Sequence, residues 1–339
     1  MGGLSRRYVK IKEMKEEGKD PIILDAGDFF FSTTNLNQNN LKSEEYRAGA
    51  ILEGYDKIGC DAINIGKYEL LNGLSFLKEM STKTEISFLS ANLRDSKTKE
   101  LLFQPYKIIN KGDLSFGVIG ITNLLPDTST KIVADDYIQS GNKYIKELSE
   151  KTDIIIMLIN TDRASQKDLA ENFDNADFIV TSGSTNLTRT NAPQKDEGPY
   201  MFSCGKQGKY LLTLDANVKD LKHSFVNISN HEKKINNVQK RFERLQKKDP
   251  NKTLEDIYKD QANVLKLIDQ YRLDLKTSED AISQAKNTIV YQTIGLNKKI
   301  TDDPEILSFV NKSLSTCKSL KPKVKDLKKT KIDHSGHNH

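Results

Sequence analysis

Histidine is scarce in this chain of 339 residues. Residues 1–222 contain none, and the five histidines are His223, His231, His334, His337 and His339. Because imidazole is the commonest metal ligand and the usual acid–base group of enzymes, this absence limits the chemistry that residues 1–222 can support. Any metal or catalytic site there has to be built from other side chains.

Cysteine and long apolar runs are also scarce. The three cysteines, Cys60, Cys204 and Cys317, lie far apart and form no Cys-x-x-Cys pair, which argues against a disulfide framework or a zinc knuckle. No apolar run approaches the roughly 20 residues of a membrane span. Residues 1–20 lack the apolar core of a secretory signal, so we expect no transmembrane segment and no signal peptide in this sequence.

The charge is concentrated at one end. Between Lys318 and His339, seven lysines stand against two aspartates, which accounts for the whole net charge of +5. The remaining sequence is close to neutral and shows no basic footprint, so we expect no nucleic-acid partner.

Strands alternate with helices over residues 1–217. Apolar runs near residues 22–25, 61–65, 86–91, 106–110, 116–122, 153–159, 177–181, 201–204 and 210–215 predict strands, and amphipathic spacing predicts helices over 4–17, 43–58, 74–80, 138–150 and 164–173. This alternation predicts an α/β sandwich.

The sequence becomes highly charged after residue 217. Two helical patterns, over 230–248 and 253–285, are joined at Asp249-Pro250-Asn251 and predict an inserted αα-hairpin. A strand over 288–296 and a helix over 304–314 follow. We therefore expect an α/β domain of residues 1–217 closed by 288–316, a helical hairpin of 218–287, and a disordered basic tail of 317–339.

The stretch IILDAGDFFF, residues 22–31, marks the first candidate site. Its apolar strand breaks at Asp25-Ala26-Gly27-Asp28 and leaves two carboxylates at the carboxyl end of the strand. Ligands of open α/β sheets bind at that edge. An ordinary acidic turn explains the same residues, so this stretch alone leaves both readings open.

Several segments, in order, resemble the metallophosphoesterase domain of bacterial 5′-nucleotidases (calcineurin-like phosphoesterases). They are GGLSRR, ILDAGDFF, GYDKIGCDAINIGKYE, FLSANL, PYKII, FGVIGIT, DIIIML, ADFIVTSGST, CGKQGKYLLTLD and TIGLNKKITDDPEIL, within residues 2–217 and 288–312. The resemblance implies a fold that hydrolyses phosphate esters with two metal ions. It also implies that the family's first strand, with its Asp-x-His motif, would precede GGLSRR and is absent here.

The resemblance places Asp28 at the family's bridging metal-ligand position. In Gly66-Lys67-Tyr68-Glu69, Lys67 stands at an asparagine ligand position and Tyr68 at the catalytic histidine position. A further ligand histidine maps to Asn160. By this mapping Tyr68 and Asn160 are relics, and we hypothesise that a protonated Lys67 replaces the metal charge by an ion pair with Asp28.

The family's last motif, Gly-His-x-His, maps to Ser182-Gly183-Ser184-Thr185, where Gly183 and Thr185 occupy the histidine positions. Of the whole ligand set only Asp28 remains. The turn through Asn186 offers hydroxyls and amides to an anion, although such turns are mostly structural. At the far end, His334, His337 and His339 form a weak candidate site for Cu²⁺, Ni²⁺ or Zn²⁺, the alternative being a solvated end.

Two functions follow. The first is a non-catalytic protein of the metallophosphoesterase type, without a cofactor, that binds a protein partner through the 230–287 hairpin. The second is a phosphohydrolase of the 5′-nucleotidase type that acts on nucleotides with Mn²⁺, Zn²⁺ or Mg²⁺ in an incomplete site. The resemblance favours a periplasmic location, since relatives of this type are commonly exported.

Overall fold

The computed structural model describes residues 3–127, 130–189 and 199–322. The chain divides into two compact units. The larger comprises Met1–Leu187, Gly198–Leu211 and Gly295–His339, and the smaller comprises Thr188–Glu197 and Leu212–Ile294. Each unit is described below by itself.

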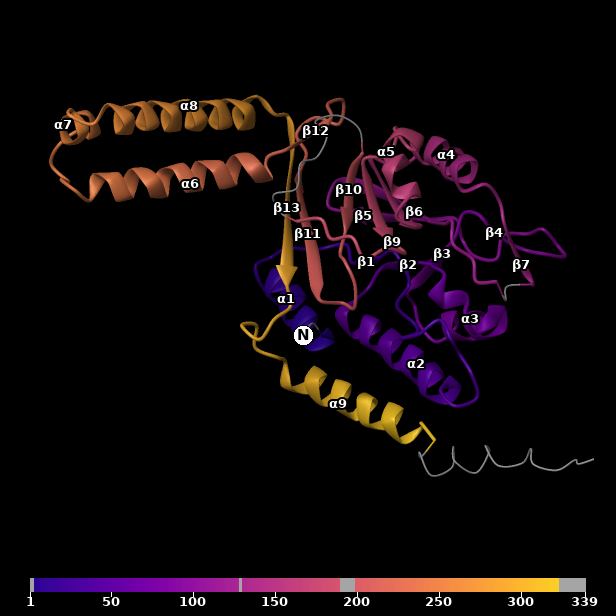
Figure 1. Ribbon diagram of the computed structural model, residues 1–339. Helices are drawn as coiled ribbons and strands as arrows, with labels where there is room; N and C mark the ends of the chain where they lie inside the picture. Colours follow the sequence, from indigo (N-terminus) through magenta and orange to yellow (C-terminus); the bar gives the residue numbers. More distant parts are fainter. Residues whose placement is uncertain (1–2, 128–129, 190–198, 323–339) are drawn as a thin grey trace, which may run out of the picture. The chain divides into compact units, whose positions relative to one another are not determined.

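The larger unit alternates strands and helices in the order that the sequence predicts (Figure 1). Its helices are α1 (Leu4–Glu16), α2 (Leu41–Ile58), α3 (Gly73–Ser81), α4 (Tyr137–Leu148), α5 (Leu169–Asn172) and α9 (Pro304–Ser319). Its strands are β1 (Leu24–Asp25), β2 (Ala62–Asn64), β3 (Ser87–Leu89), β4 (Leu93–Asp95), β5 (Tyr106–Lys111), β6 (Leu114–Thr122), β7 (Ile132–Ala134), β8 (Ile154–Asn160), β9 (Phe178–Ser182) and β10 (Tyr200–Ser203).

Two sheets form the centre of this unit. One has the order β1-β2-β3 and is parallel, and the other has the order β10-β9-β8-β6-β5, in which only β5 and β6 are antiparallel. A cluster of Ala26, Ala62, Leu89, Ile109, Val118 and Leu158, drawn from both sheets, packs together. The approach is close at Gly120, where a Cβ would stand 2.6 Å from the carbonyl oxygen of Leu89.

Helices cover the two sheets. Residues of α2 and α3 pack in one core cluster with β2 and β3, and residues of α4 and α5 pack in another with β6, β8 and β9. The helical positions buried in this way recur at the spacing of one helix face, as at Ala48, Leu52 and Tyr55. The mixed α/β fold expected from the sequence is therefore confirmed.

The smaller unit combines a sheet with a pair of long helices. The strands β11 (Tyr210–Asn217), β12 (Phe225–Asn227) and β13 (Asn287–Gly295) have the order β11-β13-β12, with β12 and β13 parallel. The helices α6 (Ser229–Gln246), α7 (Leu254–Tyr258) and α8 (Ala262–Gln284) connect β12 to β13. Figure 1 shows α6 and α8 side by side, in the positions of the expected hairpin.

The helix expected over 253–285 is two helices. Thr253 caps α7 by accepting a hydrogen bond from the backbone N–H of Asp256, and Gln261 leaves the helical conformation before α8 begins. The break lets Leu254 and Tyr258 of α7 pack with Ile268 of α8 in a small core.

Helix α9 runs through residue 317, so the start of the expected tail is helical. The candidate metal ligands His334, His337 and His339 lie outside the described residues. None of the helices in the described ranges combines the length and hydropathy that a membrane span requires.

Candidate functional site

Four strands of the larger unit bring polar residues to their carboxyl ends. Strand β1 ends at Asp25, β2 at Asn64, β8 at Asn160 and β9 at Ser182. Ligand sites of parallel sheets lie at this edge. The loops that follow these strands hold nearly all the positions that the sequence singled out.

The loop after β1 is tightly folded against the loop after β2. Gly27 has φ +96°, and a Cβ there would stand 2.7 Å from the carbonyl oxygen of Asn64. Asp28 follows with φ 71°, a left-handed conformation that is uncommon outside glycine. Such conformations persist where the surroundings fix them, and here the fixing group is a buried carboxylate.

Glu69 is that carboxylate. Its side chain is fully buried and accepts four backbone N–H groups, from Asp28 at 2.8 Å, Phe29 at 2.9 Å, Phe30 at 3.2 Å and Gly66 at 2.9 Å. It thereby ties the β1 loop to the β2 loop. The sequence reasoning gave Glu69 no role, although a lone glutamate beside the apolar pair Leu70-Leu71 signals a buried acid that needs several donors.

Two carboxylates of this site titrate abnormally. Burial, followed by the nearby charge of Asp28, raises the pKa of Glu69 from 4.5 to about 7, against the hydrogen bonds that it accepts. Burial also raises the pKa of Asp28, against the hydrogen bonds from the Tyr68 backbone N–H and the Asn160 side chain. The two acids share one partly desolvated site.

The expected ion pair between Asp28 and Lys67 is absent. Asp28 Oδ1 accepts the Tyr68 backbone N–H at 2.9 Å and a hydrogen bond from the Asn160 side chain. Lys67 meets the site through its backbone N–H, which donates to Asn160 Oδ1 at 3.0 Å, and its backbone carbonyl accepts the N–H of Leu70 at 3.2 Å. The charge of Lys67 lowers the pKa of Asp28 less than the hydrogen bonds from Tyr68 and Asn160 do.

Asn160 lies at the centre of the site and is fully buried. Its Oδ1 accepts the Lys67 N–H and, at 3.2 Å, the hydroxyl of Thr122, while its Nδ2 donates to Ser182 Oγ at 2.7 Å. Because it also bonds Asp28, this one amide joins the loops after β1, β2, β6 and β9. The sequence analysis mapped Asn160 to a position where the resemblance implies a ligand histidine. Its role in linking these segments was not predicted.

Gly183 and Thr185 do not face the site as ligands. Gly183 has φ +82°, and a Cβ there would stand 2.5 Å from the carbonyl oxygen of Thr161, so this backbone leaves no room for a side chain. Thr185 is exposed. The preceding Ser182 donates its hydroxyl to the carbonyl of Ala26 at 2.6 Å, which joins β9 to β1.

The turn considered for anion binding uses its polar groups internally. Gln166 Nε2 donates to Ser184 Oγ at 2.9 Å, and Asn186 Nδ2 donates to Gln166 Oε1 at 2.6 Å. Ser203 Oγ in turn donates to the Asn186 carbonyl at 2.8 Å. These bonds hold the turn in place and favour a structural role for it over anion binding.

Asp25 points to a separate buried cluster. The Tyr55 hydroxyl donates to Asp25 Oδ2 at 2.6 Å and accepts from Arg7 Nη1 at 3.1 Å, and the Gly27 N–H donates to Asp25 Oδ1. Burial raises the pKa of Asp25, against the Tyr55 hydrogen bond and the charge of Arg7. Asp25 therefore anchors α1 and α2 to the end of β1.

Tyr68 packs against the core cluster beside α2 and α3. Its backbone N–H donates a hydrogen bond to Asp28 Oδ1, and its hydroxyl has no hydrogen-bond partner among the described residues. The same part of the chain contains no group of three or more His, Cys, Asp or Glu side chains arranged to hold a metal ion.

Comparison with known proteins identifies relatives of this fold, although no protein-family model matches the sequence. UshA of Salmonella pullorum is 31 % identical over 156 residues, which are 43 % of this chain and 26 % of that protein. Human 5′-nucleotidase is 25 % identical over 227 residues, 63 % of this chain and 37 % of that protein. The chain is a distant homologue of the 5′-nucleotidases.

Solved structures agree with this homology at the level of the fold. The calcineurin-like phosphoesterase YfkN from Bacillus subtilis has a TM-score of 0.63 at 16 % identity, covering 95 % of this chain and 91 % of that one. A 5′-nucleotidase precursor from Thermus thermophilus has a TM-score of 0.54 at 21 % identity, covering 65 % and 46 %. The resemblance drawn from the sequence is thus confirmed as distant homology, while the match spans only about a quarter of the length of UshA.

Proposed function

We propose that this 5′-nucleotidase homologue is non-catalytic and acts as a scaffold or interaction module through its helical hairpin. The observation that carries the proposal is Asn160, whose buried amide is fully engaged in binding loops together at a position where the resemblance implies a metal ligand. A side chain saturated by protein hydrogen bonds has nothing left to offer a metal ion.

The residues present do not fit the two-metal centre that the fold family implies. Metal sites of that kind combine imidazoles and carboxylates. Here Asp28 accepts protein donors, Asn160 Oδ1 accepts two, and the Gly183 backbone leaves no room for a ligand side chain. A close approach at Gly66, where a Cβ would stand 2.7 Å from Asp28 Oδ1, further supports a site closed by protein atoms.

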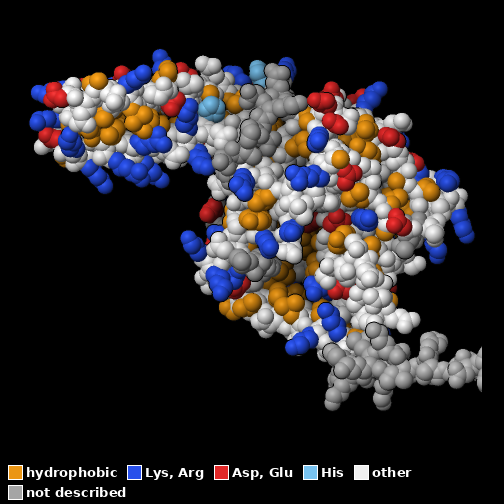
Figure 2. All heavy atoms as spheres, viewed as in Figure 1, with side chains coloured by type: hydrophobic (Ala, Val, Ile, Leu, Met, Phe, Trp, Pro, Cys, Tyr) orange, Lys and Arg blue, Asp and Glu red, His pale blue; other side chains and the backbone are white. Residues whose placement is uncertain are grey.

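The hairpin of α6 and α8 supports the interaction role. A crossover between parallel strands needs about a dozen residues, whereas the connection from β12 to β13 runs from residue 228 to residue 286. Figure 2 shows lysine and arginine side chains along α6 and hydrophobic side chains gathered between α6 and α8. Leu267 and Leu273 of α8 are 44 % and 59 % exposed.

For the domains, we propose an α/β domain of residues 1–217 closed by 288–316 and a contact element of 218–287; the two compact units divide the chain differently, because residues 212–217 and 288–294 belong to the smaller unit. Within the contact element, Arg241 Nη1 donates to the Tyr271 hydroxyl at 2.8 Å, and Lys234 pairs with Asp274 at 3.0 Å. These contacts join α6 to α8.

A phosphatase assay tests the catalytic part of the proposal. The purified chain is assayed with p-nitrophenyl phosphate and with nucleoside monophosphates, in Mn²⁺, Zn²⁺ and Mg²⁺, beside the Asp28→Ala variant. We expect no turnover above background and no difference between the two proteins. Metal-dependent turnover that Asp28→Ala abolishes would establish the alternative, a working phosphohydrolase.

The contact role is tested separately on the hairpin. A photo-crosslinking residue is placed at Leu267 or Leu273, and as a control at Ile108, an exposed apolar position on β5. We expect a discrete crosslinked product in cells from the α8 positions and none from Ile108. Equal crosslinking from all three positions would contradict the assignment of the contact surface to the hairpin.

A further inference from the structure

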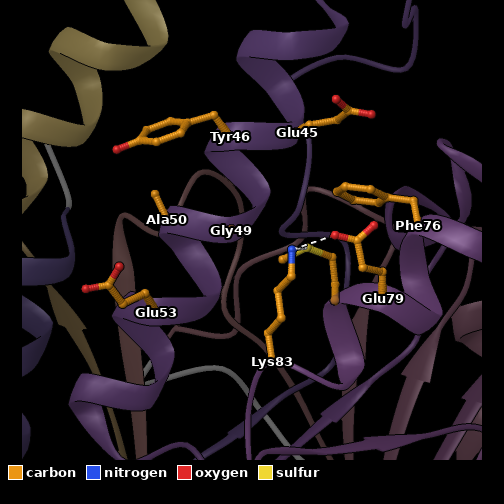
Figure 3. Close-up of a pocket in the computed structure, with 9 residues that line it drawn as sticks. Glu45, Tyr46, Gly49, Ala50, Glu53, Phe76, Glu79 and Lys83 are labelled. Carbon is orange, nitrogen blue, oxygen red and sulfur yellow. Dashed lines mark hydrogen bonds and ion pairs between the residues drawn. The ribbon is translucent and has the colours of Figure 1, made fainter.

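A groove between α2 and α3 lies outside the site described above. It has a volume of about 380 Å³ and is lined by Glu45, Tyr46, Gly49, Ala50, Glu53, Phe76, Glu79, Met80 and Lys83. Figure 3 shows Glu45, Tyr46 and Glu53 projecting from α2, with Phe76, Glu79 and Lys83 on the opposite wall. Neither the candidate site nor the packing of the sheets gives this groove a role.

The chemistry of the groove suits lysine side chains. Its lining has three carboxylates against one ammonium. Lys83 Nζ pairs with Glu79 at 2.7 Å and the neighbouring Lys57 Nζ with Glu53 at 3.5 Å, so Glu45, which accepts a hydrogen bond from Asn72 Nδ2 at 2.9 Å, is the one carboxylate of the lining without a cation among the described residues. Figure 3 shows the Phe76 ring on the same side as Glu79 and Lys83, whereas Tyr46, which is 36 % exposed, and Glu53 point from α2 to the other side. A lysine can rest its aliphatic stem on such rings while its ammonium meets a carboxylate.

The described chain ends beside this groove. Helix α9 packs along α2 in the opposite direction, because Lys57 Nζ lies 5.2 Å from the Phe309 ring centre and Ser43 Oγ donates to the Cys317 carbonyl at 2.8 Å. The end of α9, which precedes residue 322, therefore lies near the end of α2 that carries Glu45 and Tyr46.

We propose that the lysine-rich segment 323–339 of the same chain docks in this groove. The segment carries five lysines against two aspartates, a charge opposite to that of the groove. Its 17 residues can span up to about 55 Å when extended, whereas the α2 wall from Glu45 to Glu53 measures only about 12 Å. The segment is thus long enough to reach along the full groove, and docking there would cover the surface that a lysine-rich partner would otherwise bind.

Binding of the tail in trans tests this. A synthetic peptide of residues 323–339 is titrated into the chain truncated after residue 322, in low salt. We expect saturable binding that weakens at least tenfold in the triple variant Glu45→Gln, Glu53→Gln, Glu79→Gln. The matched control, Asp260→Asn, Glu279→Gln, Asp280→Asn, removes three exposed carboxylates of the smaller unit and should bind as the truncated chain does.

The full chain completes the experiment. A tethered segment acts at an effective concentration of about a millimolar, so the intact chain should bind the peptide at least tenfold more weakly than the truncated chain. Equal binding by both, no binding by the truncated chain, or unchanged binding by the groove variant would each overturn the proposal. Concentration-dependent dimers of the intact chain that dissociate on truncation would also overturn it, because they indicate exchange of tails between two copies.

Discussion

At the scale of single residues, two buried side chains organise the candidate site. Glu69 gathers four backbone N–H groups, and Asn160 joins four loops through one amide. Both work by satisfying backbone and hydroxyl groups that would otherwise be buried without partners. Both residues therefore contribute to the stability of the larger unit.

Replacement of Asn160 should destabilise the larger unit. Asn160→Ala removes the acceptor of the Lys67 N–H and the donors to Ser182 Oγ and Asp28 and leaves a gap at a fully buried position, at a cost of about 3 kcal/mol. Urea unfolding monitored by circular dichroism measures the difference. Exposed Thr185, changed to alanine, should alter stability by less than about 0.5 kcal/mol, and equal effects from both changes would contradict the role given to Asn160.

Glu69 should make stability depend on pH. Its pKa is raised from 4.5 to about 7 in the folded chain, so the folded state binds more protons than the unfolded state between these values. Its contribution is fully present below about pH 4.5 and is lost as the pH rises through 7, by about 3 kcal/mol.

The variant Glu69→Gln cannot ionise and should flatten this part of the profile of unfolding free energy between pH 4.5 and 8. Asp28 contributes a slope of the same sign because its pKa is also raised, so Asp28→Asn is measured alongside. An unchanged slope in Glu69→Gln would show that this carboxylate titrates normally.

At the scale of elements, the turn after β9 shows how tightly the loops pack. Gly183 and Gly112 both have positive φ, but a Cβ at Gly183 would meet the Thr161 carbonyl oxygen at 2.5 Å, whereas a Cβ at Gly112 would meet nothing within 4 Å. Comparing these two glycines separates the cost of a left-handed backbone, which both share, from the cost of steric crowding, which only Gly183 has.

Alanine at these two glycines should therefore differ in cost. Gly112→Ala should lower the free energy of unfolding by about 1 kcal/mol, from the left-handed conformation alone, and Gly183→Ala by about 3 kcal/mol. Thermal and urea unfolding of the two variants check the difference. Similar losses would mean that the β9 turn yields to a side chain.

Most helices and strands of the α/β unit follow from the sequence, and the exceptions have local causes. The helix expected over 164–173 is a turn followed by the short α5, because the Asp162 carboxylate binds the N–H groups of Ala164 and Ser165 in a turn. The three-residue strands β4 and β7, which pair with each other, were not predicted, because the pairing joins segments about 40 residues apart. In the smaller unit β12 was missed for a similar reason, since the long helical hairpin separates it from its partner β13.

At the scale of the whole molecule, the sequence predicted the fold but not the contacts of the candidate site residues. The order of the family-like segments is a linear property and gives the fold. The partners of Asp28 depend on the meeting of four loops, so the expected Lys67 contact was wrong and the amide of Asn160 takes that place. The role of Glu69 was not predicted for the same reason, since its four backbone N–H donors come from two separate loops.

We propose that hydrogen bonds within the protein occupy the side chains at the positions where the resemblance implies metal ligands. The most direct test of this proposal is equilibrium dialysis against Mn²⁺ or Zn²⁺ followed by metal analysis, on the chain truncated after residue 322 so that tail histidines do not contribute. We predict less than about 0.1 equivalent of metal per chain, the amount expected from nonspecific binding, and the same value in Asp28→Asn. About two equivalents, lost in Asp28→Asn, would contradict the account.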